Sequence, residues 1–225
     1  LNLPVLQDTI ESNCLEDNSM PVELKDVKAF VDWKARPAVL LEDGKAYAIV
    51  SEDGKWTSAP VFCSSMAAGE DPRLPYNKGI EALTYFSKGR LIALSESEFS
   101  SNSNSVLGWV GHSKGWIELT YLIGGGYRVT GAATLPNGNI MVLERLFSRG
   151  GKNAIRLKSI EAGSIIGGTV LEGKLIAELS SPITIDNFEG IAIREEFKGK
   201  AIIYLISDDN FNPEQRTLLM IFEMH

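Results

Sequence analysis

A hairpin pattern that recurs along the chain constrains its fold more than any other feature. In three segments small residues open a strand, a glycine turn follows, and a second strand ends near an acid: GIEALTYFSKGRLIALSE, VTGAATLPNGNIMVLER and NFEGIAIREEFKGKAIIYLISDD. A weaker copy is DVKAFVDWKARPAVLLEDGKAYAIVSED. Ala82 precedes Ala132 by 50 positions, and Ala132 precedes Gly190 by 58. Repeats of about 50 residues that hold several short strands are typical of propeller blades.

The repeats predict an all-β fold, a β-propeller with about four recognisable blades. Apolar runs such as AYAIV, RLIALS and AIIYLIS follow turn sequences such as EDGK, SKGR and FKGK, which indicates hairpins rather than βαβ units. We expect less than about a tenth of the chain to be helical, with a short helical turn allowed in SPITIDNFEGIAIREEF. A β-sandwich is the alternative, although it would not need the repeat. We interpret residues 1–225 as a single domain in which residues 1–25 are irregular.

The composition excludes two classes of partner. Hydrophobic residues make up 44% of the chain and the formal net charge is -7, with a pI of about 5.0. Lys and Arg form no stripe along the chain, so nucleic acid is not an expected partner. The longest apolar runs, such as AIIYLI, are far shorter than the roughly 20 residues that cross a bilayer. No membrane span is therefore expected.

The two cysteines leave two interpretations open. Cys14 and Cys63 are far apart in the sequence and no CxxC motif is present, so a zinc site built on thiolates is excluded. The pair forms either one disulfide or two separate, half-buried thiols.

The segment from Gly111 to Gly115 matches G-x-S-x-G, the pattern of a serine hydrolase's nucleophile elbow. That elbow needs a strand before the serine, a helix after it, and then an acid and a histidine in chain order. The residues that follow, WIELTYLIG, have a strand pattern, and the one histidine downstream is His225 at the end of the sequence. We therefore predict that Ser113 is an exposed turn residue and not a nucleophile.

Four segments stand out beside the repeat: NKGIEAL, LPNGNIMVLERLFSRGG, DNFEGIAI and SDDNFNPEQRTLLMIFEM. Together they resemble the bacterial family called esterase-like activity of phytase, from about Val22 to the C-terminus. The resemblance implies a β-propeller, an ester hydrolase, and a periplasmic or secreted location. Members normally carry one more N-terminal blade. The chain also departs from the family pattern at residues 26–30 and at Gly131, where an acidic residue is common.

Acidic residues occupy equivalent points of the predicted blades. Glu81 and Glu189 begin first strands and, on this plan, point toward a central channel, whereas other acids end second strands. Carboxylates that converge repel one another, and a hard cation with roughly six to eight oxygen ligands relieves the repulsion. We therefore predict a calcium site, with ligands from Glu81, Glu96, Glu144, Asn187, Glu189, Asp208 and Asp209, to which Asn210 could add an oxygen.

The predicted catalytic residues are two glutamates, Glu81 and Glu189, and two arginines, Arg145 and Arg216. Arg145 and Arg216 carry forked donors that suit a phosphate or pair with Glu81 and Glu189. The alternative is structural: the two glutamates accept backbone N–H bonds between blades, and the arginines are their buried partners.

Several residues near these candidates have a simpler expected role. Asp208, Asp209 and Asn210 could cap a turn at the end of a strand. Phe188 and Phe211 are predicted to pack in the interior, and the basic residues between positions 145 and 158 are predicted to form a solvated hairpin face.

Two classes of function follow from these residues. The first is a metal-assisted hydrolase of phosphate or carboxylate esters, in which the cation activates water, a channel carboxylate is the base, and Arg145 or Arg216 steadies the negative charge. The second is a propeller that binds a ligand or partner protein without chemistry. A propeller fold alone does not decide between them.

The last strand pattern, RTLLMIFEM, needs a neighbour, because an open apolar edge favours aggregation or pairing with another chain. Residues 1–25 contain little strand pattern. We therefore predict that a further N-terminal segment or a second polypeptide closes the ring.

Overall fold

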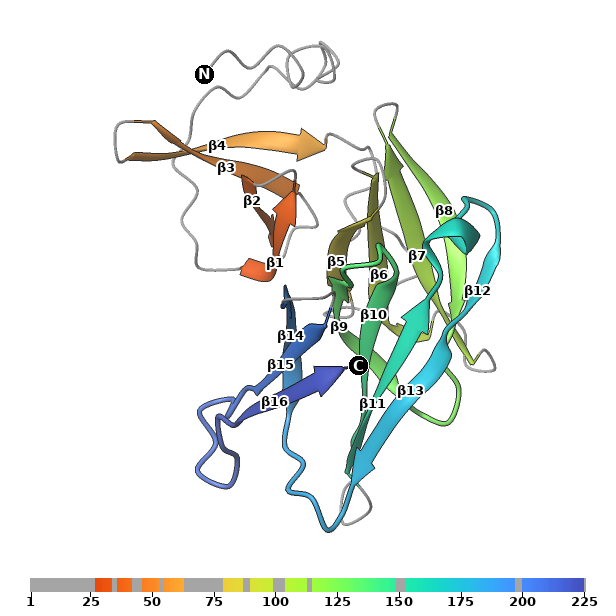
Figure 1. The fold of residues 1–225 in the computed structure, drawn as a ribbon, viewed down its shortest axis with the longest axis vertical. Helices are drawn as coiled ribbons and strands as arrows, with labels where there is room; N and C mark the ends of the chain where they lie inside the picture. The colour runs from red at the N-terminus through yellow and green to blue at the C-terminus, as the bar shows by residue number, and fades with distance from the viewer. Residues whose placement is uncertain are drawn as a thin grey trace.

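Among the described residues, nearly all of the regular secondary structure is β-strand (Figure 1). The computed structural model describes residues 27–33, 36–41, 46–52, 55–62, 79–86, 90–98, 104–112, 115–148, 153–196 and 200–224. These residues form sixteen strands and one 3-10 helix, Ala162–Ser164, so the all-β class and the low helix content are confirmed for the described part of the chain. The helical turn allowed in residues 181–197 is absent from the described part of this segment, residues 181–196, whose second half forms strand β14 (Phe188–Glu195).

The first sheet is an antiparallel meander in which the strands lie in chain order. Its members are β1 (Val27–Trp33), β2 (Arg36–Leu41), β3 (Ala46–Glu52) and β4 (Lys55–Phe62). Each connection joins neighbouring strands, as the hairpin pattern predicted.

The second sheet repeats this plan with β5 (Ile80–Phe86), β6 (Arg90–Glu98), β7 (Ser105–His112) and β8 (Gly115–Leu122). A fifth strand, β12 (Val170–Glu172), comes from further along the chain and pairs in parallel with β8. Gly115 begins a strand that pairs with β7, and not the helix that a nucleophile elbow requires. Ser113 itself lies outside the described residues.

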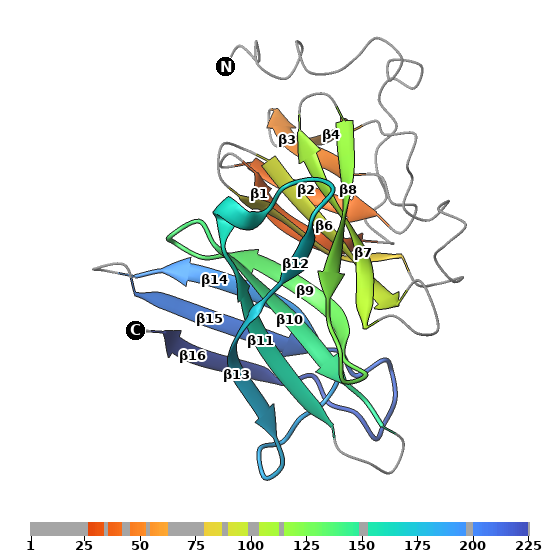
Figure 2. The same cartoon turned by 90° about the vertical axis from the view of Figure 1, so that its right-hand side faces the viewer.

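The third and fourth sheets are antiparallel and lie side by side (Figure 2). The third sheet contains β9 (Arg128–Thr134), β10 (Ile140–Leu146), β11 (Ala154–Ile160) and β13 (Lys174–Ser180). The fourth sheet contains β14, β15 (Ala201–Ser207) and β16 (Leu219–Met224).

The first strands of the sheets contact one another in chain order: β1 with β5, β5 with β9, and β9 with β14. The hydroxyls of Thr84 and Thr134, 50 positions apart, are separated by 2.9 Å. The Thr130 hydroxyl donates to the backbone oxygen of Phe188, 58 positions later, at 3.0 Å. These are the two offsets that the repeat predicted, so the alignment of the hairpins is confirmed.

Strand β10, inside the third sheet, is buried on both faces, and its alternate residues point to opposite sides of the sheet. On β10, Ile140 and Val142 join a core with the second sheet, whereas Met141 and Leu143 join a core with the fourth sheet. A strand buried on both faces needs a continuous apolar run, which explains the sequence IMVL.

One aromatic prediction holds and one fails. Phe188 is fully buried in the core between the third and fourth sheets, as predicted. Phe211 is fully exposed in the connection between β15 and β16, so the prediction that it packs is wrong.

Gly131 lies at a close contact between β9 and β14, and this contact leads to a test of the strand packing. A Cβ added at position 131 would lie 3.1 Å from the Glu189 backbone oxygen and 3.1 Å from Ile191 Cγ2. Because a backbone oxygen cannot swing away, we expect Gly131→Ala to lower the free energy of unfolding by about 1–3 kcal/mol. Urea denaturation measures the change. Gly163→Ala is the control, since a Cβ there meets nothing within 4 Å, and equal stability of the two variants would contradict the close approach.

Candidate functional site

Two of the acids predicted to converge, Glu81 and Glu189, lie on strands that are separated by another strand. Glu81 lies on β5 and Glu189 on β14, and β9 lies between these two strands. The residue of β9 equivalent to Glu81 and Glu189 is Gly131, which has no carboxylate. Glu96 on β6 pairs with Arg128, whose Nη1 is 3.3 Å from Glu96 Oε1. A common site for Glu81 and Glu189 therefore stays a prediction.

Glu144 lies in the interior, between the second and third sheets. Its side chain is fully buried, and its Oε1 accepts a hydrogen bond of 2.6 Å from the Tyr121 hydroxyl. The Arg156 guanidinium donates to Glu144 Oε2, and Lys158 Nζ is 3.4 Å from Oε1. The protein's own donors thus hold both oxygens of this carboxylate. The prediction of a solvated face is wrong at Arg145, Arg156 and Lys158, whose side chains are only 18%, 12% and 11% exposed.

The same two cations hold the turn that leads from β8 to β9. Lys158 Nζ donates to the backbone oxygens of Leu122 and Ile123, each at 3.2 Å. Arg156 donates to the oxygens of Ile123 and Gly124, and its guanidinium lies 3.9 Å from the ring centre of Tyr127. The turn needs glycine because Gly124, Gly125 and Gly126 have φ angles of 65°, 67° and 74°.

Burial shifts the ionisation of this cluster. It raises the pKa of Tyr121 well above 10.0, and the Glu144 carboxylate raises that pKa further. Burial also lowers the pKa of Lys158 below 10.5, although Glu144 opposes this shift. The raised tyrosine pKa contributes stability that is lost as the pH rises through the folded-state value. The lowered lysine pKa has the opposite sign, since stability then increases as the pH rises toward 10.5.

Replacing Glu144 by Gln tests whether this carboxylate holds the two sheets together. The variant keeps the shape of the side chain but leaves two buried cations without a counter-charge. We expect the free energy of unfolding to fall by about 3–5 kcal/mol, measured by urea denaturation. Glu196→Gln is the matched control, because its ion pair with Arg194 is exposed and should contribute less than about 1 kcal/mol. Equal losses in the two variants would contradict a structural role for Glu144.

Arg145 follows Glu144 on β10 and points to the opposite face of the sheet, toward β14. Its Nη1 lies 3.7 Å from Glu189 Oε1. The same Glu189 oxygen accepts a hydrogen bond of 2.8 Å from the side-chain amide of Asn187, a buried residue. Of the predicted site residues, the structure therefore brings together Arg145, Asn187 and Glu189.

The acids after β15 form turns within their own loop. Asp208 Oδ1 accepts the backbone N–H of Asn210, and Asp209 Oδ1 accepts that of Phe211. Asp209 Oδ2 also accepts a hydrogen bond from the Thr217 hydroxyl. These contacts correspond to the turn alternative for Asp208 and Asp209.

Asp186 fixes this loop against the start of β14. Its Oδ1 accepts the backbone N–H of Asn187 at 2.9 Å, and its Oδ2 accepts that of Arg216 at 3.0 Å. At the same end of the loop, the Ser207 hydroxyl donates to the Arg216 oxygen and accepts the N–H of Leu218. Side chains that lie before β14 and on β15 thus hold the last residues of the loop.

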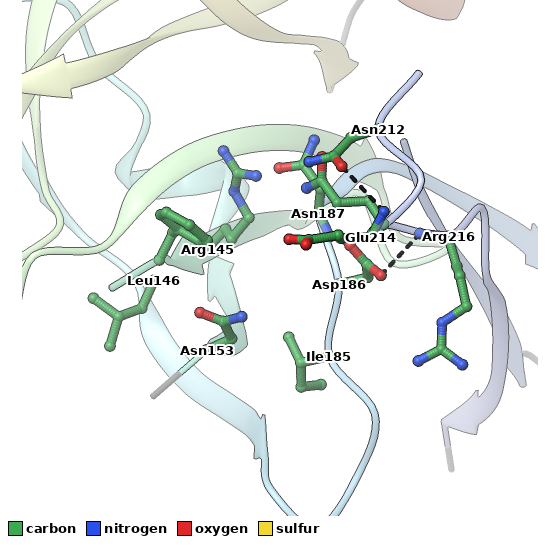
Figure 3. Close-up of a pocket in the computed structure, with 11 residues that line it drawn as sticks. Arg145, Leu146, Asn153, Ile185, Asp186, Asn187, Asn212, Glu214 and Arg216 are labelled. Carbon is green, nitrogen blue, oxygen red and sulfur yellow. Dashed lines mark hydrogen bonds between the residues drawn. The ribbon is translucent and has the colours of Figure 1, made fainter. Parts of the chain in front are cut away.

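A cavity of about 450 Å³ lies where three segments meet: the ends of β10 and β11, the approach to β14, and the β15–β16 loop. Figure 3 shows that the Arg216 guanidinium extends away from the other lining side chains, while its backbone N–H faces Asp186. The residues that line the cavity are Arg145, Leu146, Phe147, Asn153, Ile185, Asp186, Asn187, Asn212, Glu214, Gln215 and Arg216.

Two polar groups in this lining are poorly satisfied by the protein. The Arg145 side chain is 18% exposed, and its ion pair of 3.7 Å with Glu189 is longer than a hydrogen bond. Asn153 Oδ1 is buried in the wall and accepts no hydrogen bond from the described residues. A guanidinium offers five N–H donors, so the cavity can bind an anion or a developing negative oxygen at Arg145.

The residues that sequence reasoning missed are Phe147, Asn153, Asp186 and Glu214. Phe147 and Asn153 lie beside strand ends and carry no repeat signal of their own. Asp186 and Glu214 fall inside the segments DNFEGIAI and SDDNFNPEQRTLLMIFEM. These segments carry the resemblance to the phytase-like family, and that resemblance was the available signal for the two residues.

The described residues contain neither a cluster of metal-binding side chains nor a helix that could cross a membrane. Among them, no three His, Cys, Asp or Glu side chains are placed to hold a metal ion together. No helix in the same part of the chain has the length and apolar character of a transmembrane segment. Cys14 and Cys63 lie outside the described residues.

The fold and the cavity define a nearly all-β protein with an arginine-bearing polar site between two sheets. The model of the phytase-like family, described as esterase-like activity of phytase, matches residues 41–211. The chain belongs to this family, as the sequence segments indicated.

Solved structures with partial likeness are distant in sequence. An endo-arabinase from Bacteroides thetaiotaomicron aligns with 87% of this chain and 73% of its own, at 15% identity and a TM-score of 0.49. A protein of unknown function from Bacteroides caccae aligns with 91% and 80%, at 10% identity and a TM-score of 0.39. YCF48 from Cyanidioschyzon merolae covers 76% of this chain and 47% of its own, at 14% identity and a TM-score of 0.38. No curated protein matches the chain.

Proposed function

We propose that this protein hydrolyses esters of phosphoric or carboxylic acids in the cavity beside Arg145. The observation that carries the proposal is the guanidinium of Arg145, which is largely buried, lines the cavity and has no hydrogen-bonded acceptor within the described residues. Leaving such donors unpaired is costly, so the group is suited to an anionic ligand. The family description, esterase-like activity of phytase, supports the same class of reaction.

Glu214 is the proposed general base. Its backbone N–H is held by Asn212 Oδ1 at 3.0 Å, which fixes the residue at the wall of the cavity. In the proposed reaction a water molecule attacks the acyl carbon or the phosphorus while its proton passes to the Glu214 carboxylate. The bond to the alcohol oxygen then breaks, and this oxygen takes the proton from Glu214. Arg145 stabilises the negative charge that develops on the attacked group.

Replacing Arg145 by Ala tests the proposal. We expect kcat/KM for p-nitrophenyl acetate or p-nitrophenyl phosphate to fall by about a hundredfold to a thousandfold, because the charge-stabilising donors are lost. Arg145→Lys should recover part of the activity, since lysine keeps the charge but not the fork. Arg194→Ala is the control, because Arg194 is exposed on β14 and pairs with Glu196.

The outcomes separate the hydrolase from the binding module that the sequence left as an alternative. Loss of turnover in Arg145→Ala and Glu214→Gln, with unchanged melting temperatures, would support the hydrolase. Phosphate binding that depends on Arg145 in a wild-type protein without turnover would support the binding module instead.

Calcium stays a prediction of the carboxylate pattern. The predicted ligands are dispersed. Arg156 pairs with Glu144, and Arg128 pairs with Glu96. Asp208 and Asp209 accept backbone N–H groups of their own loop. The described residues therefore do not fit a cage of several carboxylates, and the reaction above uses no metal. Thermal melting during a calcium titration is the measurement: a rise in melting temperature that Glu189→Gln reduces would support the ion, whereas an unchanged temperature would oppose it.

The complete propeller and its place in the cell are also proposals. The first strands of successive sheets lie side by side from β1 to β14, but the described residues of β14 and β1 make no comparable contact. β16 forms an edge of the fourth sheet and exposes Leu219 and Ile221. We propose that a further segment or a second polypeptide closes the ring, and that the protein acts in the periplasm or outside the cell.

A further inference from the structure

The charges around the cavity restrict which anions can enter. Arg145 provides the guanidinium on the inner side, whereas Figure 3 shows Arg216 pointing away. Asp186 and Glu214 bring two carboxylates to the same lining. A ligand with several negative charges would place some of them near these carboxylates, and like charges in a partly desolvated site repel. One anionic group can bind Arg145, but a polyanion is disfavoured.

The cavity also has an apolar side that an anion alone would leave exposed. Phe147 is 61% exposed although it lines the cavity. Leu146 and Ile185 line the cavity as well, so the ring of Phe147 is not an isolated apolar surface. Ligand sites typically combine apolar walls with a few placed polar groups, and this lining has that composition.

The positions of Arg145 and Phe147 set the distance between the two parts of a ligand. Arg145 lies on β10, and Phe147 directly follows the last residue of that strand. An extended chain rises about 3.3 Å per residue, so the Cα atoms of the two residues are separated by at most roughly 7 Å. A ring attached directly, or through one or two atoms, to an anionic group can reach both side chains at once, and ring pairs favour centroid distances of about 4.5–7 Å.

The geometry points to a substrate in which a single anionic or ester group adjoins an aromatic ring, and not to a polyphosphorylated compound. This inference rests on the proposed function, because it takes Arg145 as the group that binds the ester. Arg145 binds the charged end, Phe147 packs against the ring, and Asp186 and Glu214 exclude ligands with further negative charge.

Calorimetric titration of the wild-type chain with benzoate, acetate and tripolyphosphate tests the inference. We expect benzoate to bind about tenfold more tightly than acetate, because the ring is removed from water against Phe147. Phe147→Ala should abolish this preference without changing acetate binding. Phe211→Ala is the matched control, since Phe211 is a fully exposed phenylalanine that is absent from the lining. Glu214→Gln should strengthen tripolyphosphate binding, because one repelling charge is removed.

The results distinguish failure of the inference from failure of the proposed function. Equal affinities for benzoate and acetate, both lost in Arg145→Ala, would overturn the ring preference and leave the anion site intact. Tripolyphosphate binding tighter than benzoate would overturn the exclusion of polyanions. A benzoate preference that depends on Phe147 but not on Arg145 would keep the ring site and count against Arg145 as the ester-binding group.

Discussion

The Glu144 carboxylate between the second and third sheets is the interaction on which the arrangement of the chain depends. An isolated buried charge costs several kcal/mol, and here Tyr121, Arg156 and Lys158 compensate it from both sides of the interface. Arg156 and Lys158 then use their remaining donors on the turn that connects the two sheets. The start of β9 is fixed by this turn, and β14 packs against β9. One ionic cluster thus sets the relative position of three sheets.

The alternation of side chains along β10 connects this cluster to the cavity. Glu144 and Arg145 are neighbours in sequence, so their side chains leave the strand in opposite directions. Arg156 and Lys158 neutralise the Glu144 carboxylate, whereas Arg145 reaches a cavity between the third and fourth sheets. Since both faces of the third sheet are packed, Arg145 is carried by a rigid strand. A site on such a strand is better positioned than a site carried by loops alone.

Much of the fold could be predicted from the sequence, but less of the site could. Strands and hairpins followed from local alternation and glycine turns, and the offsets of 50 and 58 residues recur as contacts at Thr84 and Thr130. The role of Glu144 could not be predicted, because its partners are 12 to 23 positions away and a strand pattern does not specify which face carries a charge. The cavity was missed for a related reason, since it forms where loops from separate hairpins meet.

Gly131 links the packing of the sheets to the chemistry proposed for the chain. The family pattern commonly has an acidic residue at this position, on the strand between those that carry Glu81 and Glu189. Yet β14 approaches β9 so closely that even a Cβ at position 131 would crowd the Glu189 backbone. An acidic side chain at position 131 would therefore require β9 or β14 to shift by a few tenths of an ångström. With that carboxylate absent, repulsion along the first strands is reduced, and a cation is less necessary to relieve it. The proposed reaction is placed at Arg145 because its guanidinium lines the cavity and has no hydrogen-bonded acceptor within the described residues.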